Sequence, residues 1–150
     1  MTHWHAVGAG CVFAGGYLLL LATLPGVSSV RLAGVPLVLG AGLLAGATAG
    51  LAADEGPHAG AWHGLLAGAV SGGVFAAVFV YVFAENVDGG VFHGLNDVLA
   101  RSAADFPVVA THGSLVVGVL AGVGWASIAA LGLFAGGRAP RRDSYRVIER

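Results

Sequence analysis

The sequence predicts an all-α integral membrane four-helix bundle, and three observations lead to this prediction. The composition is the first, because 57% of the 150 residues are hydrophobic and only 10% are charged, which is too apolar for a soluble domain. The second is the presence of four long runs without Asp, Glu, Lys or Arg, each long enough for a helix that crosses a hydrocarbon core of about 30 Å. The third is the recurrence of glycine at every fourth position, which gives a helix a smooth face without side chains.

The first two spans are bounded by residues that break helices. We predict the first span over residues 6–24, because Pro25-Gly26 follows it directly. The second is predicted over 34–53, with Pro36 in its first turn, where the missing N–H has no helical partner to lose. The acidic segment Asp54-Glu55-Gly56-Pro57 is expected to end this span and to form a short turn.

The third span is predicted over residues 61–84, with Trp62 and Tyr81 near its ends, as in the aromatic belts of membrane proteins. A different kind of segment follows it. Over 91–106 the apolar residues recur at steps of three and four, and charged residues occupy the other side. This pattern predicts a short amphipathic helix at the membrane surface, ended by Pro107.

The last span is predicted over residues 111–135, so that residues 1–136 form a single membrane domain with spans at 6–24, 34–53, 61–84 and 111–135. The remaining residues, 137–150, contain five arginines. Arginine-rich segments next to a span tend to stay in the cytoplasm. We therefore expect a multi-pass protein of the plasma membrane with both termini in the cytoplasm.

Small residues at four-residue spacing mark the positions where we expect helices to pack closely. The stripes of spans two and three are expected to pack against each other across the acidic turn, and span four carries a similar stripe. The predicted packing residues are Gly42, Gly46, Gly50, Gly60, Gly64, Gly68 and Gly72, followed in span four by Ser114, Gly118, Gly122 and Ala126. This spacing predicts glycine-zipper packing and self-association.

The histidines lie near the ends of the predicted spans, where they are candidates for a haem or metal site. Imidazole is a common metal ligand, and facing helices of a bundle can supply such ligands. The candidates are His5 and His63 at one membrane face, and His93 and His112 at the other. Histidine at a membrane interface is also ordinary without any ligand, so we predict no cofactor and no metal.

Polar side chains within the spans are few and uncharged. The absence of Asp, Glu and Arg from all four runs disfavours ion-coupled transporters and proton pumps, which usually need an ionisable group within the membrane. Hydroxyls such as Thr23 and Thr48 are expected to bond to the carbonyl four residues before them, or to another helix. Trp125 lies within a span, so its indole N–H needs a partner.

No pattern of enzymes appears in the sequence, neither a nucleophile motif nor a phosphate-binding loop nor spaced metal ligands. With a net charge of −1 and its basic residues confined to local segments, the chain is not expected to bind nucleic acid. The expected partners are the lipid bilayer and either a second copy of the chain or another membrane protein.

Three motifs carry a resemblance to a known family: Gly-Leu-Leu-Ala-Gly at 42–46, His-Gly-Leu-Leu-Ala-Gly at 63–68, and Ser-Gly-Gly at 71–73, separated by an acidic turn. Together with the absence of lysine, they resemble an uncharacterised family of small glycine-rich four-span membrane proteins from haloarchaea. The resemblance covers residues 34–136. It implies an archaeal plasma membrane, and no catalytic residues come with it.

Three functions are compatible with these features. We expect a non-enzymatic structural or accessory membrane protein whose glycine stripes drive packing with itself or with partners. A passive channel or facilitator for small solutes is an alternative, because a narrow pore lined by small residues needs no internal charge. The third possibility is a membrane redox subunit that binds haem through the histidines.

Overall fold

The computed structural model describes residues 3–23, 34–53, 56–85 and 90–140, and it places the side chains of these residues except those of 90–97. The described chain is helical and contains no strand. Its helices are α1 (Trp4–Thr23), α2 (Gly34–Ala53), α3 (Gly56–Ala84), α4 (Gly90–Asp105), α5 (Pro107–Thr111) and α6 (Gly113–Arg138). Four of them, α1, α2, α3 and α6, are long and apolar enough to cross a membrane, which agrees with the predicted bundle of four spans.

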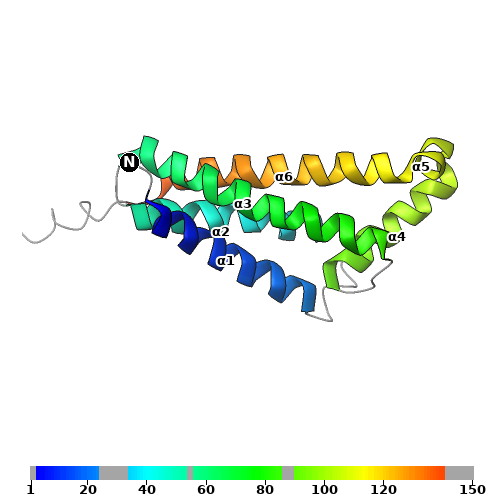
Figure 1. The fold of residues 1–150 in the computed structure, drawn as a ribbon, viewed down its shortest axis with the longest axis horizontal. Helices are drawn as coiled ribbons and strands as arrows, with labels where there is room; N and C mark the ends of the chain where they lie inside the picture. Colours follow the sequence, from blue (N-terminus) through cyan, green and yellow to red (C-terminus); the bar gives the residue numbers. More distant parts are fainter. Residues whose placement is uncertain (1–2, 24–33, 54–55, 86–89, 141–150) are drawn as a thin grey trace, which may run out of the picture.

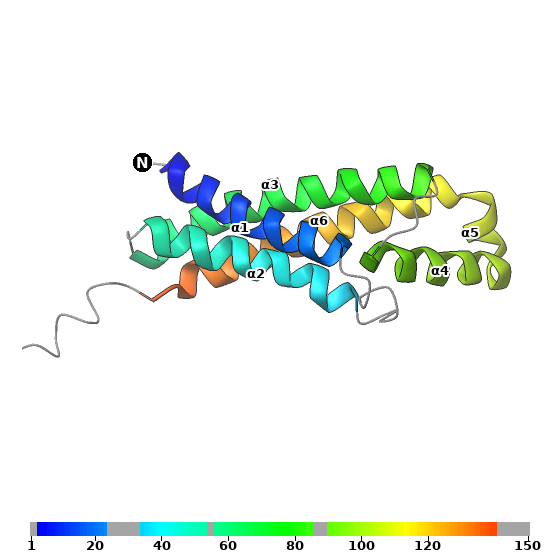
Figure 2. The same cartoon turned by 90° about the horizontal axis from the view of Figure 1, so that it is seen from below.

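The four long helices lie side by side, with α1 and α3 running in one direction and α2 and α6 in the other (Figure 1). Helix α6 packs most extensively against α3 and then against α2, whereas α1 lies against α2 and, to a smaller extent, α3. The start of α1 and the end of α6 lie at the same end of the bundle, which we call the terminal end (Figures 1 and 2). Helices α4 and α5 lie at the opposite end, the far end.

The helix boundaries follow the predictions closely for α2 and differ for α3. We predicted that Gly56-Pro57 would belong to the turn and that the third span would begin at 61, but α3 begins at Gly56. Gly56 adopts a left-handed conformation, with φ of 49°, that favours glycine. Pro57 then occupies the first turn, where a missing N–H is tolerated. The residues that remain for the turn, 54–55, lie outside the described part.

The last predicted span is interrupted near its start. Phe106 is extended, as the residue before a proline usually is, and Pro107 opens the short helix α5 instead of only ending α4. The chain then bends at His112 before α6 begins at Gly113. Helix α6 continues to Arg138, three residues beyond the predicted end of the span. The predicted surface helix matches α4 to within one residue at each end.

The core changes in character along the bundle axis. Near the terminal end it consists mainly of alanine, with Ala41, Ala45, Ala49 and Ala67 forming one buried cluster together with Val7 and Ala14. Toward the far end a second cluster contains the larger side chains of Phe75, Phe79 and Ile128. The rings of Phe75 and Phe79 stack with centroids 5.6 Å apart. Small residues therefore let the helices approach closely at one end, and aromatic rings fill the wider space at the other.

Hydrogen bonds satisfy several of the polar side chains within the spans, as predicted, whereas the buried Ser71 hydroxyl has no hydrogen-bond partner among the described atoms. Thr23 and Thr48 each donate a hydroxyl proton to the carbonyl oxygen four residues before them. Tyr17 reaches across to α2 and donates its hydroxyl proton to the Leu37 carbonyl oxygen at 2.8 Å. The indole Nε1 of Trp125 donates to the Ala69 carbonyl oxygen of α3 at 2.9 Å. Two of these bonds join different helices, and each ties one pair of spans together.

Candidate functional site

The closest approach between helices occurs where α6 lies in the groove between α2 and α3. Each of three consecutive turns of α6 presents one carbonyl oxygen to a pair of glycines, one from α2 and one from α3. Gly50 and Gly60 contact the carbonyl oxygen of Gly136, Gly46 and Gly64 contact that of Gly132, and Gly42 and Gly68 contact that of Ile128. A methyl group added at any of these six glycines would lie within 3.0 Å of that oxygen, closer than a side-chain carbon can approach. We call these contacts the glycine ladder.

The glycine ladder places the predicted residues of spans two and three at helix contacts, but with a different partner. We predicted that the two stripes would pack mainly against each other, whereas both stripes face the backbone of α6. Gly72 continues the pattern, because a methyl group there would lie 2.8 Å from the Trp125 carbonyl oxygen. Since α2 and α3 lie side by side, the glycines along their shared edge form one groove, and that groove accepts a third helix.

The predicted stripe of α6 lies on a different face from the one that enters the groove. Ser114, Gly118, Gly122 and Ala126 are exposed. A methyl group added at Gly118 or Gly122 would have no atom of another helix within 4 Å. The ladder instead uses Ile128, Gly132 and Gly136. These positions are displaced from the predicted register by two residues, which is about 200° around a helix. The prediction of helix packing through this stripe is therefore wrong for contacts within the chain.

A sequence signal for the correct face was present. Gly124, Ile128, Gly132 and Gly136 also follow a four-residue step, but the predicted span ended at 135 and excluded the last of them. The exposed stripe and the ladder therefore give α6 two faces of small residues, one occupied by α2 and α3 and one open. The exposed side chains of Leu115, Val119 and Val123 form a ridge beside the open stripe.

The candidate ligand histidines whose side chains are described lie at opposite ends of the bundle. His5 and His63 lie at the terminal end, where His5 is exposed and His63 is 1% exposed. His112 is exposed at the start of α6, and its Nδ1 lies 2.8 Å from the Thr111 hydroxyl. The side chain of His93 lies outside the described part. Within the residues that the structure describes, no group of three or more His, Cys, Asp or Glu side chains could hold a metal ion.

The hydrogen bonds of the His63 ring determine which ring nitrogen carries the proton and whether either nitrogen is available as a ligand. Its Nε2 accepts a bond from the His3 backbone N–H at 2.8 Å, and its Nδ1 lies 2.7 Å from the Ala59 carbonyl oxygen. Because an N–H can only donate and a carbonyl can only accept, the proton is on Nδ1 and Nε2 is unprotonated. Both ring nitrogens are therefore occupied, and in this arrangement His63 has no lone pair left for a haem iron or a metal ion.

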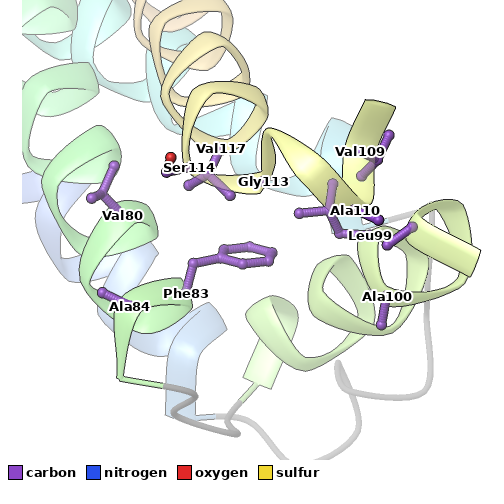
Figure 3. A pocket seen from close by; sticks show the side chains of 11 residues that line it. Val80, Phe83, Ala84, Leu99, Ala100, Val109, Ala110, Gly113, Ser114 and Val117 are labelled. Carbon is purple, nitrogen blue, oxygen red and sulfur yellow. The ribbon is translucent and has the colours of Figure 1, made fainter. Parts of the chain in front are cut away.

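One cavity lies at the far end, among the end of α3, α4, α5 and the start of α6. It has a volume of about 430 Å³, and Figure 3 shows Phe83 extending between α3 and α4 toward its centre. The lining is almost entirely apolar, including Leu99, Val109 and Val117, with the Ser114 hydroxyl at one side. A second apolar cavity of about 180 Å³ lies between α1 and α3. Neither lining contains an ionisable side chain.

These features define the class of the protein: it is a multi-pass helical membrane protein whose central contacts are made by backbone against backbone. Comparison with known proteins finds no matching family model, no matching curated protein and no matching solved structure.

Proposed function

We propose that this chain is a non-enzymatic membrane scaffold that self-associates through the open stripe of α6. The observation that carries the proposal is the open space at Gly118 and Gly122, where no atom of another helix comes within 4 Å of an added methyl group. Small residues let two membrane helices approach closely enough for van der Waals contact and weak Cα–H···O bonds between their backbones. An exposed stripe of this kind is suited to receive another helix.

A second copy of the same chain is the partner that this stripe fits best. The opposite face of α6 already packs against two helices through residues at the same four-residue step. Pairing of two α6 helices about a twofold axis would bring the same patch of each chain together. The stripe contains no charged residue, and the adjoining ridge of Leu115, Val119 and Val123 is aliphatic. The surface therefore supports association within the bilayer, without charged partners.

The packing of the bundle supports a scaffold more than a channel through one chain. The glycine ladder brings the backbones of α2, α3 and α6 into direct contact at three successive turns, and water or a solute would have to separate them. The engaged nitrogens of His63 likewise favour the scaffold over a haem-binding subunit.

We also propose that both termini face the cytoplasm. The described ends of the chain lie at the same end of the bundle (Figure 1), and in the sequence four more arginines follow Arg138, the last residue of α6. The tendency of arginine to remain on the cytoplasmic side supports this orientation.

The test of self-association is the size of the purified protein in mild detergent and its cross-linking in liposomes. We expect the unsubstituted chain to form dimers or larger assemblies, and the double variant Gly118→Leu, Gly122→Leu to shift them to monomers. The double variant should keep the helical content of the unsubstituted chain, because a methyl group at either site would meet no atom of another helix within 4 Å.

Gly73→Leu is the matched control, since Gly73 is an exposed helical glycine with equally open surroundings on α3; this variant should associate as the unsubstituted chain does. A chain that is monomeric at every concentration would refute the proposal. Equal association of the double variant and the unsubstituted chain would show that another surface is responsible.

A further inference from the structure

The side chain of His63 is a buried ionisable group that connects two helices at the terminal end. Its imidazole is 1% exposed, and its Nε2 accepts the backbone N–H of His3, which is 60 positions away in the sequence. His3 directly precedes α1, and its own carbonyl oxygen accepts the N–H groups of Ala6 and Val7 at 2.9 and 3.3 Å. His63 therefore satisfies a donor at the start of α1 from a residue of α3.

This bond exists only while His63 is neutral. A second proton would occupy Nε2, so that an N–H of the ring would face the N–H of His3 and the bond would be lost. The new charge would also stand beside the start of α1, where the unpaired N–H groups give a helix a partial positive charge. Protonation thus replaces an attraction by a repulsion at this contact.

The described charged and titratable groups at this end offer no carboxylate to offset the new charge. The His3 ring lies 5.8 Å from the His63 ring between centroids, and the His5 ring lies 5.4 Å from that of His3. His58 is exposed on α3, and Arg138 at the end of α6 packs over the Phe134 ring. Helices α2 and α6 end here with partially negative carbonyl groups, whereas Asp54 and Glu55 lie outside the described part. Imidazole and guanidinium groups therefore dominate the described surroundings.

We infer that His63 is a proton-sensitive latch, which holds the start of α1 on the bundle when neutral and releases it when protonated. The sign follows from the bond. The contribution of the latch to stability is present at higher pH, where Nε2 is unprotonated, and is lost as the pH falls. The contacts beyond the first turn of α1 include small residues, Gly10 and Ala14, packed against α2 and α3. Release of the first turn would expose part of the alanine cluster at the terminal end. This inference does not depend on self-association.

The test compares variants of His3 that differ in the backbone N–H. His3→Pro removes the donated N–H because proline has none, while His3→Ala keeps it and removes only the ring. The melting temperature of each full-length protein in detergent would be measured at about pH 8 and about pH 5, the interval in which an ordinary histidine changes charge.

We expect the melting temperature of the unsubstituted chain to fall by about 2–4 °C on acidification, as loss of one hydrogen bond predicts for a chain of this size. His3→Ala and the exposed control His58→Gln should show the same fall. His3→Pro should melt lower at pH 8 and change less with pH. None of these substitutions changes a residue of the two buried hydrophobic clusters.

Two outcomes would overturn the latch. One is an equal fall for His3→Pro and the unsubstituted chain, and the other is no fall in the unsubstituted chain. As a measurement independent of variants, nitrogen NMR of histidine-labelled protein should show one ring with its proton on Nδ1 at pH 8, and that ring should gain its second proton as the pH is lowered. The amide signal of His3 should change over the same pH interval. A change of the amide at a different pH from that of the ring would also contradict the latch.

Discussion

Gly50 and Gly60 belong to different helices yet contact the same peptide group. A methyl group at Gly50 would lie 2.6 Å from the Gly136 carbonyl oxygen, and one at Gly60 would lie 2.5 Å from it. The two glycines each lie five residues from Glu55 in the sequence, and the pairs Gly46–Gly64 and Gly42–Gly68 repeat the relationship one and two turns farther along. The α2–α3 hairpin therefore acts as one surface toward α6.

The first prediction concerns the sign of glycine-to-alanine substitutions. Gly60→Ala should lower the free energy of unfolding by about 1–3 kcal/mol, because the methyl group meets backbone that cannot rotate away. Gly73→Ala should raise it by about 0.5–1 kcal/mol, since alanine favours a helix over glycine and the site is open. Unfolding of both variants in a denaturing detergent series measures the difference. Equal effects at the two sites would contradict the close contact at Gly60.

A second prediction concerns the bond between α6 and α3. Trp125→Phe removes the indole N–H that donates to the Ala69 carbonyl oxygen, and should destabilise the protein by about 0.5–1.5 kcal/mol. Trp62 is exposed to a similar degree, 50% against 45% for Trp125, but its indole makes no hydrogen bond within the described residues, so Trp62→Phe is the control and should have a much smaller effect. The same unfolding series compares the two, and a larger loss for Trp62→Phe would show that Trp125 does not tie the helices together.

The third prediction addresses the attachment of α1 to α2. Tyr17→Phe removes the hydroxyl that donates to the Leu37 carbonyl oxygen, with an expected loss of about 0.5–1.5 kcal/mol. Tyr81 is 61% exposed on α3, and Tyr81→Phe should leave stability nearly unchanged. Limited proteolysis should also cut the connection between α1 and α2 faster in Tyr17→Phe. Identical cleavage of the two variants would argue against a role of this bond in holding α1.

The sequence was sufficient to predict the spans and the contact faces of α2 and α3, because both are set by local patterns. Uncharged runs mark the membrane helices, and glycines such as Gly46 and Gly64 mark the faces on which backbones can meet. The partner of those faces was not predictable in the same way. A helix face of small residues can pack against any other such face. Which face of α6 enters the groove, the one with Gly132 or the one with Gly118 and Gly122, depends on the packing of all the helices together.

The histidines illustrate a second limit. His63 and Trp62 are adjacent, yet one is 1% and the other 50% exposed, because consecutive helix positions point about 100° apart. His63 lies next to Gly64 and about one helical turn after Gly60, and both glycines pack against α6. The glycine stripe therefore indicates that the His63 side chain points toward the bundle interior. Its bond to the His3 N–H involves residues far apart in the sequence, and no spacing rule predicts such a pair.

The order of the helices along the chain has a consequence for biosynthesis. The ribosome makes α2 and α3 before α6, so the groove of glycines exists in the membrane before the helix that fills it. Until then lipid tails must occupy the groove, and the arrival of α6 displaces them. The last span therefore completes the assembly, and a chain that ended between residues 85 and 113 would leave the glycine groove of the α2–α3 hairpin open to other membrane proteins.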